Sequence, residues 1–217
     1  MKYLKTYKLF ERYINGELYL YNPTDSYDVN DNISVIRLMY KTTMLDELPK
    51  KLKILDCKSN NGWLYRLPKL PPTLEELYCD NNVISRLPEL PDSLKILSCY
   101  NNKLNKLSDL PEKLTNLYCE NNNLKELPDL PESLKILHCY NNPLKKLPKG
   151  INNRLLEQNN NNGWINENAY KWIIKQPNNY NILKDYLSNE EKEKLEKIHP
   201  EILSQDQFGM FGLKNDK

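Results

Sequence analysis

Long apolar runs are absent from this sequence of 217 residues. No segment approaches the ~20 consecutive apolar residues that a membrane-spanning helix needs. The first residues, MKYLKTYKLFERYI, interleave lysines with apolar residues and lack a cleavage site of small residues, so we expect no signal peptide. Blocks of like charge are also missing, and the formal net charge is only +2. We therefore expect a soluble, cytoplasmic protein, in its own cell or a host cell, that binds neither nucleic acid nor membrane.

Residues suited to catalysis are scarce as well. The chain has only two histidines, and it contains no phosphate-binding glycine loop, no zinc signature and no motif of paired carboxylates. Its 39% of hydrophobic residues can still form the core of one domain or of one repeat array. The sequence predicts a folded protein that is not an enzyme and holds no cofactor or metal.

Five cysteines recur at a nearly fixed interval, and each lies in a similar segment. Four of the segments read LEELYCDNN, LKILSCYNN, LTNLYCENN and LKILHCYNN, and the consensus of the full unit is LxxLxCxxNxLxxLPxLPxx. Such a period is the signature of a repeat architecture. An eroded unit fits upstream, with Val35, Leu38, Tyr40, Thr43, Leu45, Leu48 and Pro49 on the same offsets. The cysteines are Cys57, Cys79, Cys99, Cys119 and Cys139.

Alternation within each unit predicts a short strand with one buried face. Leu77 and Cys79 would point into the core, whereas Glu76, Tyr78 and Asp80 would point away from it. One such strand per unit, stacked in parallel at about 4.8 Å, buries an apolar face that a single unit could not bury. The side chains that point away form a surface that we call the outer sheet face.

The second half of each unit is rich in polar turn residues and proline. Prolines three positions apart remove backbone donors and fix φ, so we expect an extended, polyproline-like return segment on the convex side. An asparagine three positions after each cysteine would point inward and bond backbone groups that the turn leaves unpaired. These residues are Asn82, Asn102, Asn122 and Asn142.

The cysteines could bind zinc, form disulfides, act as nucleophiles or fill the core. Zinc sites use closely spaced ligands, and the nearby His138 should point to the face opposite Cys139. Disulfides between equivalent positions of adjacent parallel strands fit the bridge geometry poorly, and a catalytic thiol needs an exposed position beside a base. The inward slot instead predicts reduced, buried thiols that pack as small hydrophobic side chains.

This pattern resembles the leucine-rich repeat over roughly residues 35–150. Its short form with LPxLP looks like the repeats of bacterial effectors of the invasion-plasmid-antigen type and of large-virus proteins, which usually have an aliphatic residue in place of the cysteine. Some of those effectors carry a carboxy-terminal ubiquitin-ligase domain with a catalytic cysteine. No cysteine follows Cys139, so we expect no such activity here.

Both flanks are suited to covering the ends of the array. In an amino-terminal cap of residues 1–34, Asn15-Gly16 predicts a hairpin, although a helix over residues 2–10 is equally arguable. Residues 151–217 read as an Asn-rich connector, a helical cap and a tail, with a capping box at Ser188 and Glu191. The side chains expected to cover the last repeat are Trp164, Trp172, Ile173, Leu183 and Leu187.

We expect the outer sheet face, which is concave in a curved array, to bind a protein partner. Its tyrosines and isoleucines, rimmed by two acids, have the composition of an interaction hot spot, although the same residues also suit strands. The candidate contacts are Tyr78, Asp80, Ile96, Tyr100, Tyr118, Glu120, Ile136, His138 and Tyr140. We expect a monomeric interaction module. The alternatives are a self-assembling structural protein and a truncated relative of a ubiquitin-ligase effector.

Overall fold

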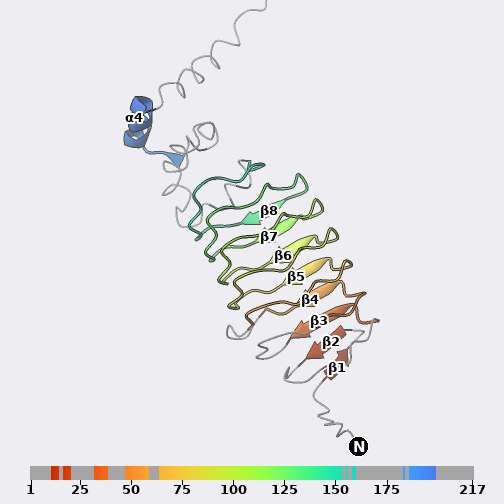
Figure 1. The fold of residues 1–217 in the computed structure, drawn as a ribbon. Helices are drawn as coiled ribbons and strands as arrows, with labels where there is room; N and C mark the ends of the chain where they lie inside the picture. The colour runs from red at the N-terminus through yellow and green to blue at the C-terminus, as the bar shows by residue number, and fades with distance from the viewer. Residues whose placement is uncertain are drawn as a thin grey trace, which may run out of the picture.

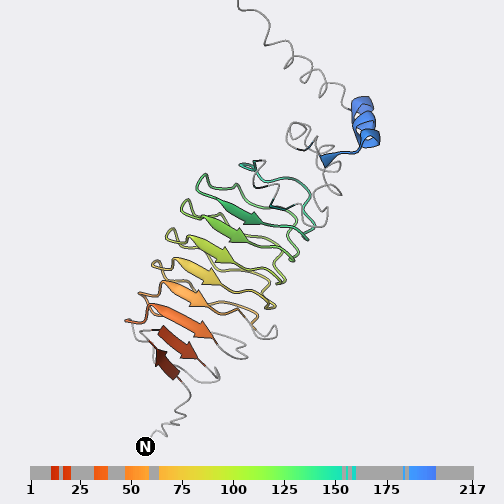
Figure 2. The same ribbon diagram turned by 180° about the vertical axis from the view of Figure 1, so that it is seen from behind.

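The computed structural model describes residues 11–14, 17–20, 32–38, 47–58, 64–152, 155, 158–159, 183 and 186–198. Its strands form one sheet in chain order, and Figures 1 and 2 show them stacked side by side along the array. Neighbouring strands from β2 to β8 are all parallel, so the protein is a repeat solenoid, as predicted. The strands are β1 (Glu11–Ile14), β2 (Glu17–Leu20), β3 (Val35–Leu38), β4 (Ile54–Asp56), β5 (Glu76–Tyr78), β6 (Ile96–Ser98), β7 (Asn116–Tyr118) and β8 (Ile136–His138).

The amino-terminal end of the sheet is the predicted hairpin. β1 and β2 pair in antiparallel orientation, with Ile14 opposite Glu17, so that Asn15-Gly16 falls between the strands. β2 then pairs in parallel with β3 and thereby connects the hairpin to the array. The alternative helix over residues 2–10 lies outside the described residues.

The register of the eroded repeat differs from the prediction by two residues. Ile36, not Leu38, pairs with Leu55 in the inward leucine slot, and Leu38 takes the slot that cysteine fills elsewhere. Val35 pairs with Ile54 on the outer sheet face and is only half-buried. Several aliphatic residues lie close together here and the connector is short, so the spacing alone does not determine the register.

The core is a continuous column of leucines and cysteines. The central leucine of each strand from β4 to β8 is fully buried, and the five cysteines are free and buried, as predicted. Burial raises the pKa of all five thiols, which keeps them protonated and unreactive at neutral pH. The return segments between the strands contain neither helix nor strand within residues 64–152 outside β5–β8, as the prolines predicted.

The paired asparagines at each turn have two different roles. The second asparagine is buried: Asn102 donates from Nδ2 to the carbonyls of Cys79 (2.9 Å) and Cys99 (3.1 Å), and its Oδ1 accepts from the Ile84 amide (3.0 Å). This bonding confirms the predicted inward amide. The first asparagine, which sequence reasoning did not interpret, has a left-handed backbone, with φ of 51° at Asn101. Asparagine tolerates this conformation better than most residues, so the pair suits the turn.

The carboxy-terminal edge of the sheet is closed by side-chain amides. Asn159 Oδ1 accepts from the Cys139 amide, and Asn159 Nδ2 donates to the Leu137 carbonyl at 2.8 Å. Gln158 similarly accepts from the Leu137 amide at 2.8 Å and donates to the Lys135 carbonyl at 3.1 Å. These side chains take the place of a further strand and occupy an edge that could otherwise pair with another chain.

A helix, α4 (Asn189–Ile198), follows at the carboxy-terminal side (Figure 1). Its predicted capping box is present, because the Ser188 amide donates to Glu191 Oε2 at 2.9 Å and the Glu191 amide donates to Ser188 Oγ at 3.3 Å. Leu183 and Leu187 are buried, whereas Trp164, Trp172 and Ile173 lie outside the described residues. Among the residues described, no helix has the length and apolar character needed to cross a bilayer.

Candidate functional site

Strand register arranges the outer sheet face in rows that run along the array. In the first row, Glu76, Ile96, Asn116 and Ile136 lie on successive strands. In the middle row, Tyr78, Ser98, Tyr118 and His138 do so. A third row follows the ends of the strands, where backbone bonds from Asn101 to Glu120 and from Asn121 to Tyr140 keep the residues aligned. This row consists of Lys58, Asp80, Tyr100, Glu120 and Tyr140.

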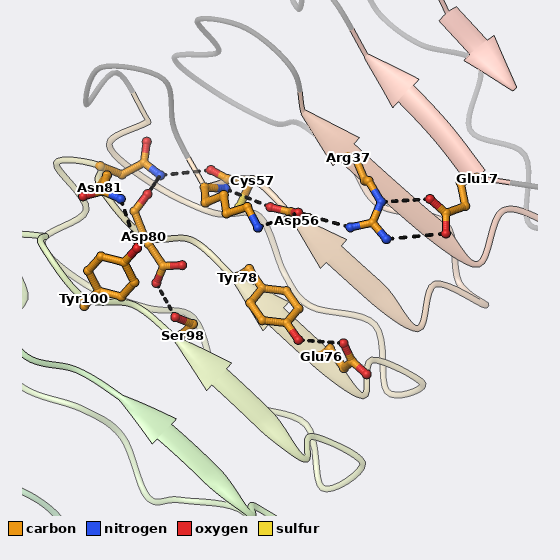
Figure 3. Close-up of polar contacts among 12 residues, drawn as sticks. Glu17, Arg37, Asp56, Cys57, Glu76, Tyr78, Asp80, Asn81, Ser98 and Tyr100 are labelled. Atoms are coloured by element: carbon orange, nitrogen blue, oxygen red, sulfur yellow. Dashed lines mark hydrogen bonds and ion pairs between the residues drawn. The ribbon is translucent and has the colours of Figure 1, made fainter. Parts of the chain in front are cut away.

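The amino-terminal part of the face carries a charged cluster (Figure 3). Arg37 Nε donates to Glu17 Oε2 at 2.8 Å, and its Nη1 donates to Asp56 Oδ2 at 3.2 Å. Lys58 Nζ lies 3.3 Å from the same Asp56 oxygen. Arg37 was not among the candidates predicted from the sequence, although a two-residue shift of register leaves it on the outer sheet face in either case. Its charges are matched within the cluster, which leaves little driving force for a charged partner here.

The carboxy-terminal part, on β5–β8, is aromatic. The Tyr118 and His138 rings meet edge to face with their centroids 5.1 Å apart, and His138 lies 6.1 Å from Tyr140. The predicted tyrosines and isoleucines of the face are half-buried, so part of each side chain is available for contact. Tyr78 is held by a bond from its hydroxyl to Glu76 Oε2 at 2.9 Å (Figure 3), and desolvation with this bond raises its pKa to about 12.

Asp80 and Glu120 do not form the exposed acidic rim that the sequence predicted. Their side chains point to the outer sheet face, but the two residues are only 3% and 7% exposed. The reason lies in the third row, where each acid is followed by a tyrosine on the next strand. Strands lie only about 4.8 Å apart, so a large ring covers the shorter side chain beside it.

The two buried acids differ in the hydrogen bonds that their carboxyl oxygens accept. Asp80 Oδ1 accepts from the Ser98 hydroxyl at 2.5 Å (Figure 3), and desolvation raises its pKa to about 6. At the equivalent place beside Glu120, the serine is replaced by His138. Glu120 Oε2 is buried and has no hydrogen-bond partner in the described part of the chain. Desolvation, aided by the negative charge of Asp80, raises the pKa of Glu120 to about 7.

This carboxyl should make the stability of the protein depend on pH. The pKa of Glu120 is higher in the folded chain than its ordinary value near 4.5, so the folded state binds the proton more tightly. The resulting stabilisation is complete below about pH 4.5 and is lost as the pH rises through about 7. We expect the free energy of unfolding to fall by about 2 kcal/mol from pH 5 to pH 8. Asp80, whose pKa is also raised, contributes to this fall in the acidic part of the range.

Denaturant unfolding at several pH values measures this effect. Glu120→Gln should remove most of the slope above about pH 6, whereas Glu132→Gln, which changes an exposed carboxylate, should retain it. An unchanged slope in Glu120→Gln would assign the pH dependence to another group.

The face offers binding chemistry, and no catalytic arrangement is evident in the described residues. The thiols lie beneath the sheet, and burial raises their pKa, so they are poorly placed to act as nucleophiles. No group of three or more His, Cys, Asp or Glu residues in the described ranges is arranged to hold a metal ion. What remains accessible is an aromatic and aliphatic surface above two partly desolvated carboxyls.

Parts of this chain are similar to solved structures of two bacterial proteins. No known family model and no curated protein matches the chain. A solved leucine-rich repeat domain of a Shigella effector is 38% identical, with a TM-score of 0.48, and the alignment covers 50% of this chain and 49% of that one. YopM, a leucine-rich effector protein from Yersinia pestis, is 31% identical with a TM-score of 0.35, and the alignment covers 54% and 45%. The chain thus spans about half the length of either structure.

Proposed function

We propose that this chain is a protein-interaction module that binds its partner on the aromatic part of the outer sheet face. The observation that carries the proposal is the row structure of β5–β8. It brings tyrosines from four consecutive repeats, with Ile96 and Ile136, onto one half-buried surface. Large aromatic side chains that are already partly ordered give much contact area at a low cost in entropy, and they dominate interaction hot spots.

The distribution of charge supports the same surface. Lysines and arginines are numerous between residues 64 and 152. All of them are exposed, and none lies in the three rows on β5–β8. Charged residues, lysine above all, are depleted at the centres of protein interfaces. A surface without lysine in a lysine-rich chain therefore has the character of an interface.

The alternative of a self-assembling structural protein has less support. End-to-end stacking of solenoids needs a free strand edge, and Gln158 and Asn159 occupy the backbone groups of β8. A ubiquitin-ligase activity would need a reactive cysteine, and the described cysteines are all buried.

A double variant, Tyr100→Ala with Tyr118→Ala, tests the proposal. A photo-reactive phenylalanine analogue at position 100 should first capture the partner, and the binding constant of the purified pair can then be measured by calorimetry. We expect the double variant to lose at least ~2 kcal/mol of affinity, about a 30-fold weakening, because hot-spot aromatics carry most of the binding energy.

The matched control is Tyr65→Ala, which removes an exposed tyrosine that lies away from the outer sheet face. It should bind the partner with unchanged affinity. Circular dichroism and denaturant melts must show that the double variant remains folded. Unchanged affinity in a folded double variant would exclude this surface as the binding site.

A further inference from the structure

The buried carboxyl of Glu120 lacks a partner that its counterpart has. Asp80 and Glu120 are equivalent positions two repeats apart, and each precedes the left-handed asparagine of its turn. Asp80 accepts from Ser98, whereas Glu120 Oε2 accepts from no described group. Leaving a buried acceptor unpaired costs roughly 1–3 kcal/mol, and more when it is charged. A donor supplied from outside would recover this energy.

The surroundings of Glu120 favour a cation as that donor. In the third row it lies between Tyr100 and Tyr140, one strand away on either side. Strands are about 4.8 Å apart, so each tyrosine residue is one strand spacing from Glu120. The Tyr100 hydroxyl accepts from Asn81 Nδ2 at 3.4 Å (Figure 3), so this ring must change rotamer to face a group above Glu120. A cation within about 6 Å of an aromatic ring gains a favourable cation–π interaction. Two flanking rings above one carboxyl can thus enclose a positive group.

The charges on the outer sheet face also favour a cation at this place. The three rows on β5–β8 contain Glu76, Asp80 and Glu120 but no lysine or arginine. His138 is the basic side chain next to Glu120 in these rows, and desolvation lowers its pKa, which leaves it neutral at pH 7. Consequently no cation of these rows competes with an incoming one for Glu120.

We infer that Glu120, Tyr100 and Tyr140 form a subsite for an arginine side chain of the protein partner. The inference rests on the proposed function, whose binding surface it narrows to a basic segment of the partner. Arginine fits better than lysine because its planar guanidinium is weakly hydrated, stacks on aromatic faces and can donate two parallel hydrogen bonds to one carboxylate. Access of the guanidinium to Oε2 requires the partly exposed tyrosine rings to change rotamer, and the binding energy of the partner supplies the cost of that change.

The subsite can be tested without the partner. The probe is the peptide acetyl-Gly-Gly-Arg-Gly-Gly-amide, and its matched control contains citrulline, a neutral group of nearly the same shape. Carbon-detected NMR of the glutamate carboxyl groups in the full chain reports binding at Glu120 directly. We expect a saturable shift of the Glu120 carboxyl with the arginine peptide, at least about tenfold tighter than with the citrulline peptide. Binding should also lower the pH at which this carboxyl titrates.

Two variants make the result specific. Glu120→Gln removes the carboxyl reporter, so binding to this variant is followed by the NMR signals of the Tyr100 and Tyr140 rings. This variant should bind the arginine peptide at least about tenfold more weakly, whereas Glu132→Gln, which makes the same change in net charge on an exposed return segment, should bind as the unmodified chain does. Equal binding of the two peptides, equal binding by Glu120→Gln, or no saturable shift would overturn the subsite.

The same experiments separate the subsite from the proposed binding face. If the arginine peptide does not bind while the Tyr100 and Tyr118 double variant still loses its partner, the subsite is wrong and the proposed binding face stands. If the peptide binds but the double variant keeps its partner, the proposed binding face is wrong.

Discussion

Replacing Leu97 with alanine should lower the free energy of unfolding by about 2–5 kcal/mol. Leu97 is fully buried at the centre of β6 and pairs with Leu77 on one side and Leu117 on the other. The change removes three buried carbons and leaves a cavity that the stacked strands cannot close, because every neighbouring repeat fixes its own spacing. Since a domain of this size has only about 5–15 kcal/mol of stability, the loss could unfold the array under mild conditions.

Denaturant unfolding followed by circular dichroism measures this change. Lys103→Ala is the matched control, since it truncates an exposed side chain in the same repeat and should change the stability by less than about 0.5 kcal/mol. Repeats interact mainly with their neighbours, so the slope of the transition should be compared as well as its midpoint. A loss below about 0.5 kcal/mol at Leu97 would mean that the inward slot is misassigned.

The regular part of this fold could be read from the sequence because five copies of one unit report on the same environment. Leu77, Cys79 and Asn82 recur with their spacing intact, so an accidental match at one copy does not mislead. Their burial in the structure follows from the alternation of a short strand and from the turn after it. The hairpin at Asn15-Gly16 was predictable for a similar reason, since a two-residue loop of this type strongly favours one geometry.

Register and edge closure could not be read in this way. Ile33, Ile36 and Leu38 are all aliphatic, so the pattern in the eroded repeat fits two registers, and pairing with β4 decides between them. Gln158 and Asn159 lie in a segment rich in similar amides, and nothing in the order of residues shows which two reach the edge of β8. Both features depend on contacts with another segment of the chain.

The sequence predicted which residues lie on the outer sheet face, but not how deeply each of them is buried. Alternation correctly placed Tyr100, Glu120 and Tyr140 on the outer sheet face, because it determines which way each side chain points. It gives no information on how far a neighbouring ring covers the side chain beside it. The burial of Asp80 and Glu120 is therefore a property of rows across the repeats, and only the parallel stacking reveals it.

Replacing Asn102 with alanine should destabilise the protein by about 3 kcal/mol, although the side chain is small and polar. Its amide bonds the carbonyls of Cys79 and Cys99 and accepts from the Ile84 amide, so it joins consecutive repeats through buried backbone groups. With alanine at this position, the buried backbone groups would lose a hydrogen-bond partner and could not bond to water instead. Each group left unpaired in this way lowers the free energy of unfolding by roughly 1–3 kcal/mol. Asn102→Asp keeps the acceptor but turns a negative charge toward the carbonyls, so it should be at least as harmful at pH 7 as alanine and less harmful at pH 4.

The neighbouring asparagine provides the control. Asn101 has an exposed side chain and a φ of 51°, which glycine adopts without strain. Asn101→Gly loses only an exposed bond from Asn101 Nδ2 to Asn81 Oδ1 and should change the free energy of unfolding by less than about 1 kcal/mol. Urea unfolding of Asn102→Ala and Asn101→Gly measures the loss of stability at each of these two adjacent positions. Equal losses at the two positions would show that the buried amide contributes no more to stability than the exposed one.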